Sequence, residues 1–535
     1  MSTRATAWTY AALGVAFVAT RATLIWRFPP HSDEAIFEKW TLAMSQDLGQ
    51  AFIPLTFGQH PMQEWLALGP ARLGLEPLTS LRLVTIVAGL VTMGAVAWLA
   101  REVAGPWAGL AAAAVWLVVP FGLVYGVIGL ADPVVAALAA VAMGLQFALA
   151  RRPRIGVALV LGVVLGAGIL VKLTMLTAVW LVPLGLLLLD WRREGLGGRV
   201  ARWAGLLLLA CLIAFAMYQV LRLSVHWDQL QASQKGAARH GVLDFLEHPG
   251  RWVEHNWPSF RQALSGYLTA PLVLAVAVGA GLTIRRTPRV GLYVVGWAAL
   301  PLAAVVALAD TPYVRWMLVA VPALMVLAGI GVAIVVRAVL AAVGSARRPL
   351  VWAACAILAV VLAAPALAWD VRTIRQPTTR PYPGNDEVDY VEAYSAGGPW
   401  LELVPRFRRI PGAVRVATLG SGLEHLEVSL RGHVAFVPVA VAGPEAVLAL
   451  QNTEDPLPRS APPFAWQPVE RLQRPHDGTP VTLSRRVVRV GSRVADDPTA
   501  LRRVLGSEAA TSRFEARHPA VARWVAAWNE AYRPS

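Results

Sequence analysis

Residues 7–40 read AWTYAALGVAFVATRATLIWRFPPHSDEAIFEKW and carry an apolar stretch straight into a pair of acids. Ala7 to Trp26 is apolar apart from Arg21, and a segment of about 20 such residues can cross a bilayer as a helix. Asp33 and Glu34 stand just outside this span. Ionisable groups beside hydrocarbon are costly and tend to mark functional sites. The stretch therefore predicts a membrane helix with a carboxylate site at one membrane surface.

The composition of the whole chain is that of a protein that crosses the membrane many times. Of its 535 residues, 56% are hydrophobic and only 15% are charged, and the mean hydropathy is +0.53. The net charge of +15 would suit a nucleic-acid binder, but the arginines cluster in short loops between apolar stretches, where positive charge sets the orientation of the helices. No nucleic-acid partner is therefore expected. Abundant Ala and Arg with few Lys are typical of a GC-rich bacterium, so the bacterial plasma (inner) membrane is the expected location.

The apolar stretches predict an all-α polytopic membrane protein with about eleven transmembrane helices. The predicted spans are 7–27, 83–100, 107–124, 132–150, 155–171, 173–189, 203–222, 267–284, 290–309, 316–338 and 350–369. A cytoplasmic N-terminus places every Arg-rich loop inside and the C-terminus outside, and the first span is expected to stay as an anchor. The outer loops 28–82 and 223–266 are long enough to fold on the membrane surface. Helices are expected in the first of them at 33–48 and 60–75.

The chain changes character after residue 369, which predicts two domains, a transmembrane domain at 1–369 and an extracytoplasmic α/β domain at 370–535. Strands are expected in VRVATLG (414–420), VAFVPVAV (434–441) and RRVVRVGSRV (485–494). Amphipathic helices are expected at 399–410, 421–432 and 519–532. Gly420 and Gly422 suggest a nucleotide-binding fingerprint, but the third glycine is missing, so a tight strand-to-helix turn is the preferred interpretation.

The acid pair has two interpretations that are compatible with each other. One carboxylate can accept a proton from an attacking hydroxyl while the other orients a neighbour or a metal. Alternatively, Ser32 or Asp33 caps a helix whose first turn is acidic, which suits the helix dipole.

Further charged residues interrupt apolar stretches, and the predicted topology puts them on the same outer side as the acids. Asp132 precedes Pro133 at the mouth of the fourth span, where the alternative is helix capping. Lys172 lies in GILVKLTML, and its alternative is snorkelling to the interface. Arg315 follows Asp310 and Tyr313, so its alternative is a salt bridge to Asp310. With Arg82 at the start of the second span, these residues predict one outer cavity for a substrate with a lipid tail and a phosphate head.

Histidines in the outer loops offer an alternative role for this surface. His31 and His60, together with Glu34, supply donors for a divalent metal, and Glu64 lies near His60 in sequence. No tight pattern such as HExxH is present, so the sequence requires no cofactor, and a divalent metal stays an open alternative.

The order of these motifs resembles the GT-C glycosyltransferases, in particular the protein O-mannosyltransferases and the lipid A aminoarabinose transferase. The resemblance covers roughly residues 1–340 and rests on order and spacing rather than on a single motif. It is carried by HSDEAIFEKW at 31–40, GQHPMQEWLALGPARLGLEPLTSLRLVTIVAGL at 58–90, GPWAGLAAAAVWLVVPFGLVYGVIGLADPVVAAL at 105–138, GILVKLTML at 168–176 and PYVRWMLVAVPALMVLAG at 312–329.

The resemblance implies inverting transfer of a sugar from a polyprenyl-phosphate donor to an extracytoplasmic acceptor, which is a glycan, a lipid or a protein of the cell envelope. Asp33 would be the general base and Glu34 its helper. The residues implied at the donor or the acceptor are His60, Glu64, Arg82, Asp132, Lys172, Tyr313 and Arg315. Two positions depart from the family pattern: Met62 replaces a usual proline, and Trp316 follows Arg315 where the family has tyrosine.

A non-catalytic function is the alternative prediction, either a lipid or polymer transporter or a scaffold of the cell envelope. Transporters often place charged groups and broken helices near the bilayer midplane. The charges of this chain are expected at one face instead, which favours the transferase.

Overall fold

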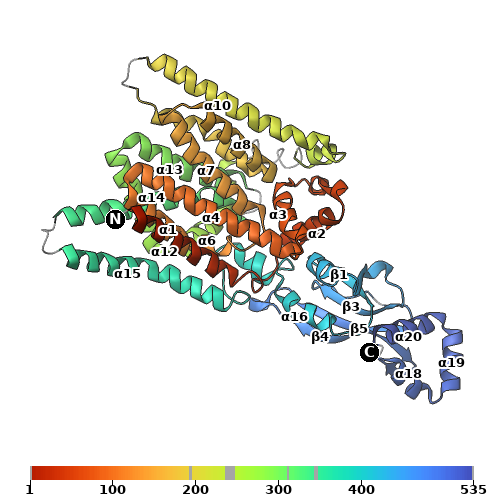
Figure 1. The fold of residues 1–535 in the computed structure, drawn as a ribbon. Helices are drawn as coiled ribbons and strands as arrows, with labels where there is room; N and C mark the ends of the chain where they lie inside the picture. Colours follow the sequence, from red (N-terminus) through yellow and green to blue (C-terminus); the bar gives the residue numbers. More distant parts are fainter. Residues whose placement is uncertain are drawn as a thin grey trace. The chain divides into compact units, whose positions relative to one another are not determined.

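The computed structural model describes residues 3–191, 195–234, 247–309, 313–342, 348–458 and 460–532. Its contacts group the chain into two compact units, and Figure 1 labels their helices and strands. The first unit holds Met1–Phe28 and Trp40–Asp386, and the second holds Pro29–Lys39 and Glu387–Ser535. The short segment Pro29–Lys39, which carries the acid pair, therefore belongs with the C-terminal part of the chain.

The first unit is helical. Its α-helices are α1 (Thr3–Ala22), α2 (Ser32–Gln46, begun in the second unit), α3 (Met62–Arg72), α4 (Pro77–Ala104), α5 (Pro106–Val118), α6 (Pro120–Val124), α7 (Ala131–Arg151), α8 (Ile155–Val171), α9 (Leu176–Trp180), α10 (Leu196–Tyr218), α12 (Pro249–Arg286), α13 (Pro288–Leu308), α14 (Val321–Ala342) and α15 (Arg348–Arg375). Short 3-10 turns join them at η1 (Leu48–Gln50), η2 (Ile53–Phe57), η3 (Leu173–Met175), η4 (Val182–Leu188), η5 (Gln219–Leu223) and η6 (Val314–Val319). The prediction of a mainly helical protein with several apolar helices is confirmed.

Six helices in the described ranges are long and apolar enough to cross a membrane. They are Pro77–Ala104, Ala131–Arg151, Leu196–Leu223, Val253–Arg286, Pro288–Ala307 and Val321–Ala342. The predicted count of about eleven spans and the predicted orientation stay predictions. The predicted span 107–124 is divided into α5 and α6 at Pro120, and 173–189 is a series of short turns that includes Pro183. Proline lacks the backbone N–H that a continuous helix needs, which explains both interruptions.

Small residues let the apolar helices approach each other closely. Gly329 of α14 lies against Ala112 of α5, and a methyl group added at Gly329 would stand 2.6 Å from the Ala112 backbone nitrogen. Between membrane helices, where lipid is as apolar as the side chains, such close van der Waals contact is a main source of association. Helices α4, α5 and α14 accordingly pack against one another, and Figure 1 labels two of them, α4 and α14.

The long segment between α1 and α4 folds into the helices that the sequence predicts. The expected helices at 33–48 and 60–75 correspond to α2 and α3, with η1 and η2 between them. Leu55 of η2 packs in one buried cluster with Leu170 at the end of α8, Leu221 and Leu230. Apolar burial of this kind fixes the segment between α1 and α4 on the ends of α8 and α10.

The second unit contains a mixed sheet with helices packed on it. Its elements are η8 (Val388–Glu392), α16 (Gly398–Phe407), β1 (Val414–Gly420), α17 (Glu424–Ser429), β2 (Val434–Pro438), η9 (Val439–Val441), β3 (Ala446–Asn452), β4 (Phe464–Leu472), η10 (Pro475–Asp477), β5 (Val481–Val490), β6 (Arg493–Ala495), α18 (Pro498–Leu505), α19 (Glu508–Arg517) and α20 (Pro519–Ala531). The strand order is β2-β1-β3-β5-β4, with β6 paired to β5. Strand β1 is parallel to both neighbours, while β5 is antiparallel to β3, β4 and β6.

The predicted C-terminal sheet domain is therefore confirmed, but strands β3 and β4 went unpredicted. The prediction of one strand at 485–494 is wrong, because the chain turns between β5 and β6 there and the two strands pair with each other. The predicted strand VRVATLG coincides with β1. Strand β3 reads AVLALQN, in which Ala, Leu and Gln favour a helix, and β4 contains Pro468. Burial of β3 between its two neighbouring strands overrides the helical preference of its residues.

Candidate functional site

The acid pair lies in the first turn of α2, and the structure shows how that turn is capped. The backbone N–H of Ala35 donates to the carbonyl of His31 at 2.9 Å, so His31 rather than Ser32 or Asp33 is the N-cap residue. The His31 Nδ1 accepts from the Asp33 N–H at 3.2 Å, and the Glu34 Oε2 accepts from the His31 N–H at 3.3 Å. This is the reciprocal pattern of a capping box, so the expectation that Ser32 or Asp33 provides the cap is wrong.

The two acids consequently differ in exposure and in use. Glu34 is fully buried and its carboxylate serves the cap. Asp33 is only half-buried, which leaves its carboxylate the more accessible of the two. Of the pair, Asp33 is therefore the better placed to exchange a proton with a bound molecule.

Contacts within the second unit hold the start of α2 from both sides. The Ser32 N–H donates to the Ser395 carbonyl at 3.0 Å, and His31 forms an antiparallel bridge with Ala396. On the other side, Glu38 Oε2 lies 2.8 Å from His425 Nδ1, and His425 Nε2 lies 3.2 Å from the Ser429 hydroxyl.

Two residues near the acid pair, Glu424 and His425, were not singled out from the sequence. Both lie in α17, directly after the turn of Gly420 and Gly422, whose φ angles are +103° and +77°. Burial raises the pKa of the Glu424 carboxyl above its usual value, and the charges of Glu427 and Asp33 raise it further. The TLGSGLEHL segment, predicted as a tight turn, was the available signal, but nothing in the sequence connects it with residue 33.

The first unit holds the other predicted site residues, and it pairs two of them. Lys172 Nζ lies 2.8 Å and 2.9 Å from the two carboxylate oxygens of Asp132. Asp132 sits in the first turn of α7 and Lys172 ends α8, and their side chains are 6% and 22% exposed. An ion pair this far from water is expensive to form, so both groups depend on the pairing.

His60 and Glu64 flank the start of α3 and are both buried. His60 Nδ1 contacts the Ile169 carbonyl, three residues before Lys172, and its Nε2 lies 3.1 Å from Gln234 Nε2. Burial lowers the pKa of His60. Burial also raises the pKa of Glu64 to about 8, and the Glu64 Oε2 has no hydrogen-bond partner among the described residues.

Gln63, between these two residues, was not predicted as a site residue. Its Nε2 donates to the Gly129 carbonyl at 2.7 Å, which lies three residues before Asp132. The start of α3 is therefore attached both to the approach to α7 and to the end of α8, the two helices that carry the Asp132–Lys172 pair. The one sequence signal for Gln63 was that it lies within the family-like segment at 58–90.

The remaining cations are buried. Arg82 is 1% exposed and its Nη1 donates to the carbonyls of Ile25 and Phe28 at 2.7 Å and 2.9 Å, which fixes the backbone after α1. Arg315 is 8% exposed and lies over the Tyr313 ring, 4.5 Å from its centroid. Asp310, the alternative partner proposed for Arg315, lies outside the described residues.

No group of three or more His, Cys, Asp or Glu residues is placed to hold a metal ion in the part of the chain that the structure describes. Of the suggested ligands, His31 and Glu34 belong to the second unit and cap α2, while His60 belongs to the first unit with both ring nitrogens in contact. A metal site and a single cavity uniting Asp33 with the cations of the first unit stay predictions.

Comparison with known proteins agrees with this fold. The dolichyl-phosphate-mannose-protein mannosyltransferase family matches residues 58–218. The structure of apo ArnT from Cupriavidus metallidurans is similar with a TM-score of 0.58 at 16% identity, over 90% of this chain and 98% of that one. The chain has the GT-C fold. No curated protein sequence matches it significantly.

Two further solved structures share the architecture. ArnT from Cupriavidus metallidurans bound to undecaprenyl phosphate has a TM-score of 0.53 at 16% identity, over 92% of this chain and 99% of that one. An oligosaccharyltransferase from Archaeoglobus fulgidus, tethered with an acceptor peptide, has a TM-score of 0.52 at 11% identity, over 81% of this chain and 64% of that one. The predicted resemblance to GT-C glycosyltransferases of the aminoarabinose and protein mannosyltransferase type is thereby confirmed.

Proposed function

We propose that this protein is a bacterial plasma-membrane glycosyltransferase that moves a sugar from a polyprenyl-phosphate donor to an acceptor outside the cytoplasm. The observation that carries the proposal is the shared GT-C fold over 90% of the chain with ArnT, a structure of which holds undecaprenyl phosphate. The helices in the described ranges that are apolar enough to span a membrane suit a donor with a lipid tail. The acceptor belongs to one of three classes, glycan, lipid or protein.

In the proposed reaction, Asp33 accepts the proton of an acceptor hydroxyl. The acceptor oxygen attacks the anomeric carbon of the donor sugar from the face opposite the phosphate, which inverts that centre. The bond between the anomeric carbon and the phosphate oxygen breaks, and polyprenyl phosphate leaves with the bonding electron pair. Asp33 suits the role because it is the more exposed acid of the pair, whereas the buried Glu34 keeps the helix start in place.

Negative charge develops on the departing phosphate, so fixed cations lower the barrier. Lys172 is the proposed phosphate cation. Its ammonium group has three N–H donors, and the two carboxylate oxygens of Asp132 accept two hydrogen bonds from it, so a third donor is left for the phosphate. Tyr313 and Arg315 are proposed to line the donor site with His60 and Glu64. Arg82 is proposed to act through the backbone that it holds, since it donates to the carbonyls of Ile25 and Phe28.

The test is a transfer assay with purified protein, a panel of radiolabelled polyprenyl-phosphate sugars and a membrane extract from the source cell. Wild type is compared with Asp33→Asn and with Asp455→Asn, an exposed carboxylate of the same unit. The proposal expects label in a new product with wild type and Asp455→Asn, and a loss of at least about 100-fold with Asp33→Asn. Retention of all label on bound lipid by the wild type would support a transporter or scaffold instead.

Whether transfer requires a divalent metal is a separate question, and the same assay answers it. Transfer that continues at the same rate in excess EDTA would remove the metal from the mechanism. A loss that Mg²⁺ or Mn²⁺ restores would retain it.

A further inference from the structure

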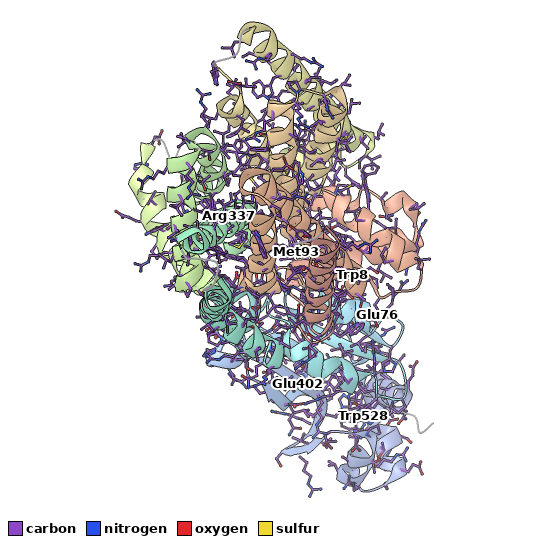
Figure 2. The ribbon with its side chains drawn as sticks, turned by 60° about the vertical axis from the view of Figure 1, so that its left-hand side comes forward. Trp8, Glu76, Met93, Arg337, Glu402 and Trp528 are labelled. Carbon is purple, nitrogen blue, oxygen red and sulfur yellow. The ribbon has the colours of Figure 1, made fainter. Side chains whose placement is uncertain are left out.

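A cavity in the second unit is lined by none of the candidate site residues described above. Its volume is about 340 Å³, at the low end of the range of roughly 300–1,000 Å³ found for small-molecule sites. Helix α16 supplies one wall, α20 another, and strands β3, β4 and β5 the floor. Figure 2 labels Glu402 on α16 and Trp528 on α20, the two helices that form the walls.

The inner surface of the cavity is apolar and aromatic. Leu403, Phe407 and Leu448 are buried in its depth. The rings of Trp528 in α20 and of Tyr532, the residue that follows this helix, lie 4.6 Å apart between centroids with an angle of 31° between their planes. Tyr532 is 38% exposed, so part of this aromatic wall faces outward. The face of an aromatic ring carries partial negative charge and packs well against the C–H groups on one face of a saturated ring.

Two arginines line the cavity, and each is paired with a carboxylate that lies outside the lining. Arg406 pairs with Glu470 and, at 3.4 Å, with Glu402. Arg485 pairs with Asp496 at 2.9 Å. Because each arginine is matched by a carboxylate, the rim has no excess positive charge that would select a phosphate or another anion. The arginine–carboxylate pairs at the rim present N–H donors and carboxylate acceptors next to each other to a bound molecule.

A buried donor also lies at this rim. The Nε of Arg485 is buried and has no hydrogen-bond acceptor among the described residues. Buried N–H groups are nearly always paired with protein, water or ligand. A molecule that brings hydroxyl oxygens to the cavity would supply the missing acceptor.

We propose that this cavity binds a neutral saccharide of one or two pyranose rings. A pyranose has an apolar C–H face for Trp528 and Tyr532, and a ring of hydroxyls that both donate and accept at the arginine–carboxylate pairs. An acyl chain would leave those pairs desolvated without partners, which is costly. The site is separate from the proposed transfer reaction and does not depend on it.

The test is a binding titration of the full-length protein in lipid nanodiscs, because maltoside detergents would themselves supply a sugar. The probes are methyl glycosides of mannose, glucose and galactose, with sodium phosphate and a short acidic peptide as comparisons, followed by tryptophan fluorescence and saturation-transfer NMR. Saturable binding of at least one glycoside is expected, with no binding of phosphate or peptide. Tyr532→Ala should weaken the binding by about fivefold to tenfold.

Tyr394→Ala is the matched control, since Tyr394 is 50% exposed in the same unit and does not line the cavity. Val469→Trp is a second variant, because Val469 is 53% exposed at the cavity and a larger side chain there should block entry without touching the core. The proposal fails if no glycoside binds the wild type, if phosphate or peptide binds in its place, or if glycoside binding is unchanged in both Tyr532→Ala and Val469→Trp.

Discussion

At the scale of single residues, the main result is that the structure distinguishes the charged residues by their burial and by their hydrogen-bond partners. Glu34 accepts from the His31 N–H and is buried, while Asp33 stays more exposed. Asp132 and Lys172 neutralise each other at the ends of two helices. Burial and hydrogen bonding, rather than residue type, therefore distinguish an acid that stabilises a turn from one that is available for chemistry.

The raised pKa of Glu64 predicts a pH dependence of stability. Its pKa rises from 4.5 to about 8 on folding, so between these values the folded state binds a proton that the unfolded state lacks. Stability due to this group therefore falls as pH rises. Glu64→Gln should become more stable than wild type between pH 5 and pH 8, by a difference on the order of 3 kcal/mol.

Thermal unfolding of both proteins across this pH range measures the effect. Glu76→Gln, an exposed acid just before α4, is the control and should follow the wild type at every pH. A constant difference in Tm between Glu64→Gln and wild type would show that Glu64 does not titrate in this range.

The Asp132–Lys172 pair predicts strong coupling between two residues that are 40 positions apart. Lys172→Met or Asp132→Asn alone should each lower stability by about 2–4 kcal/mol, because the other charge stays buried without its partner. The double variant should recover part of that loss, yet remain deficient in transfer if Lys172 binds the donor phosphate. Additive losses in stability would contradict the pairing.

At the scale of elements, the start of α2 is held by segments more than 350 residues away in sequence. Ser395 contacts Ser32, the first residue of the helix, and Ala396 contacts His31 just before it. His425 of α17 contacts Glu38 one turn after the acids. A helix start fixed on both sides has little freedom, which is what the proposed proton acceptor, Asp33, needs to keep its geometry.

His425→Ala should therefore lower kcat for transfer about tenfold, with little change in KM for the donor. His425→Gln, which keeps a hydrogen-bonding group near Glu38, should recover part of the loss. His518→Ala, a histidine at the start of α20 in the same unit, is the control and should leave kcat unchanged. An equal effect of His425→Ala and His518→Ala would mean that the contact has no positioning role.

At the scale of the whole molecule, the topology itself is open to measurement. The positive-inside pattern predicts that the C-terminal domain is outside and that the RRPR loop at 151–154 is inside. In variants with Cys211 and Cys355 replaced by alanine, a cysteine at Arg513 should react with a membrane-impermeant maleimide in intact spheroplasts. A cysteine at Arg152 should react only after permeabilisation, and the reverse pattern would invert the assignment.

Sequence by itself determined the membrane class, most of the apolar helices, strand β1 and the residue types of the candidate site, because hydrophobic periodicity and isolated charges are local signals. Only the tertiary structure decided which residues contact the candidate site residues. His425 meets Glu38 across 387 positions, and His31 instead of Ser32 caps α2, because packing of distant segments selects one of several locally acceptable arrangements. For the same reason the sequence did not predict β3. Its residues favour a helix, but hydrogen bonding to β1 and β5 and burial between these strands make it a strand.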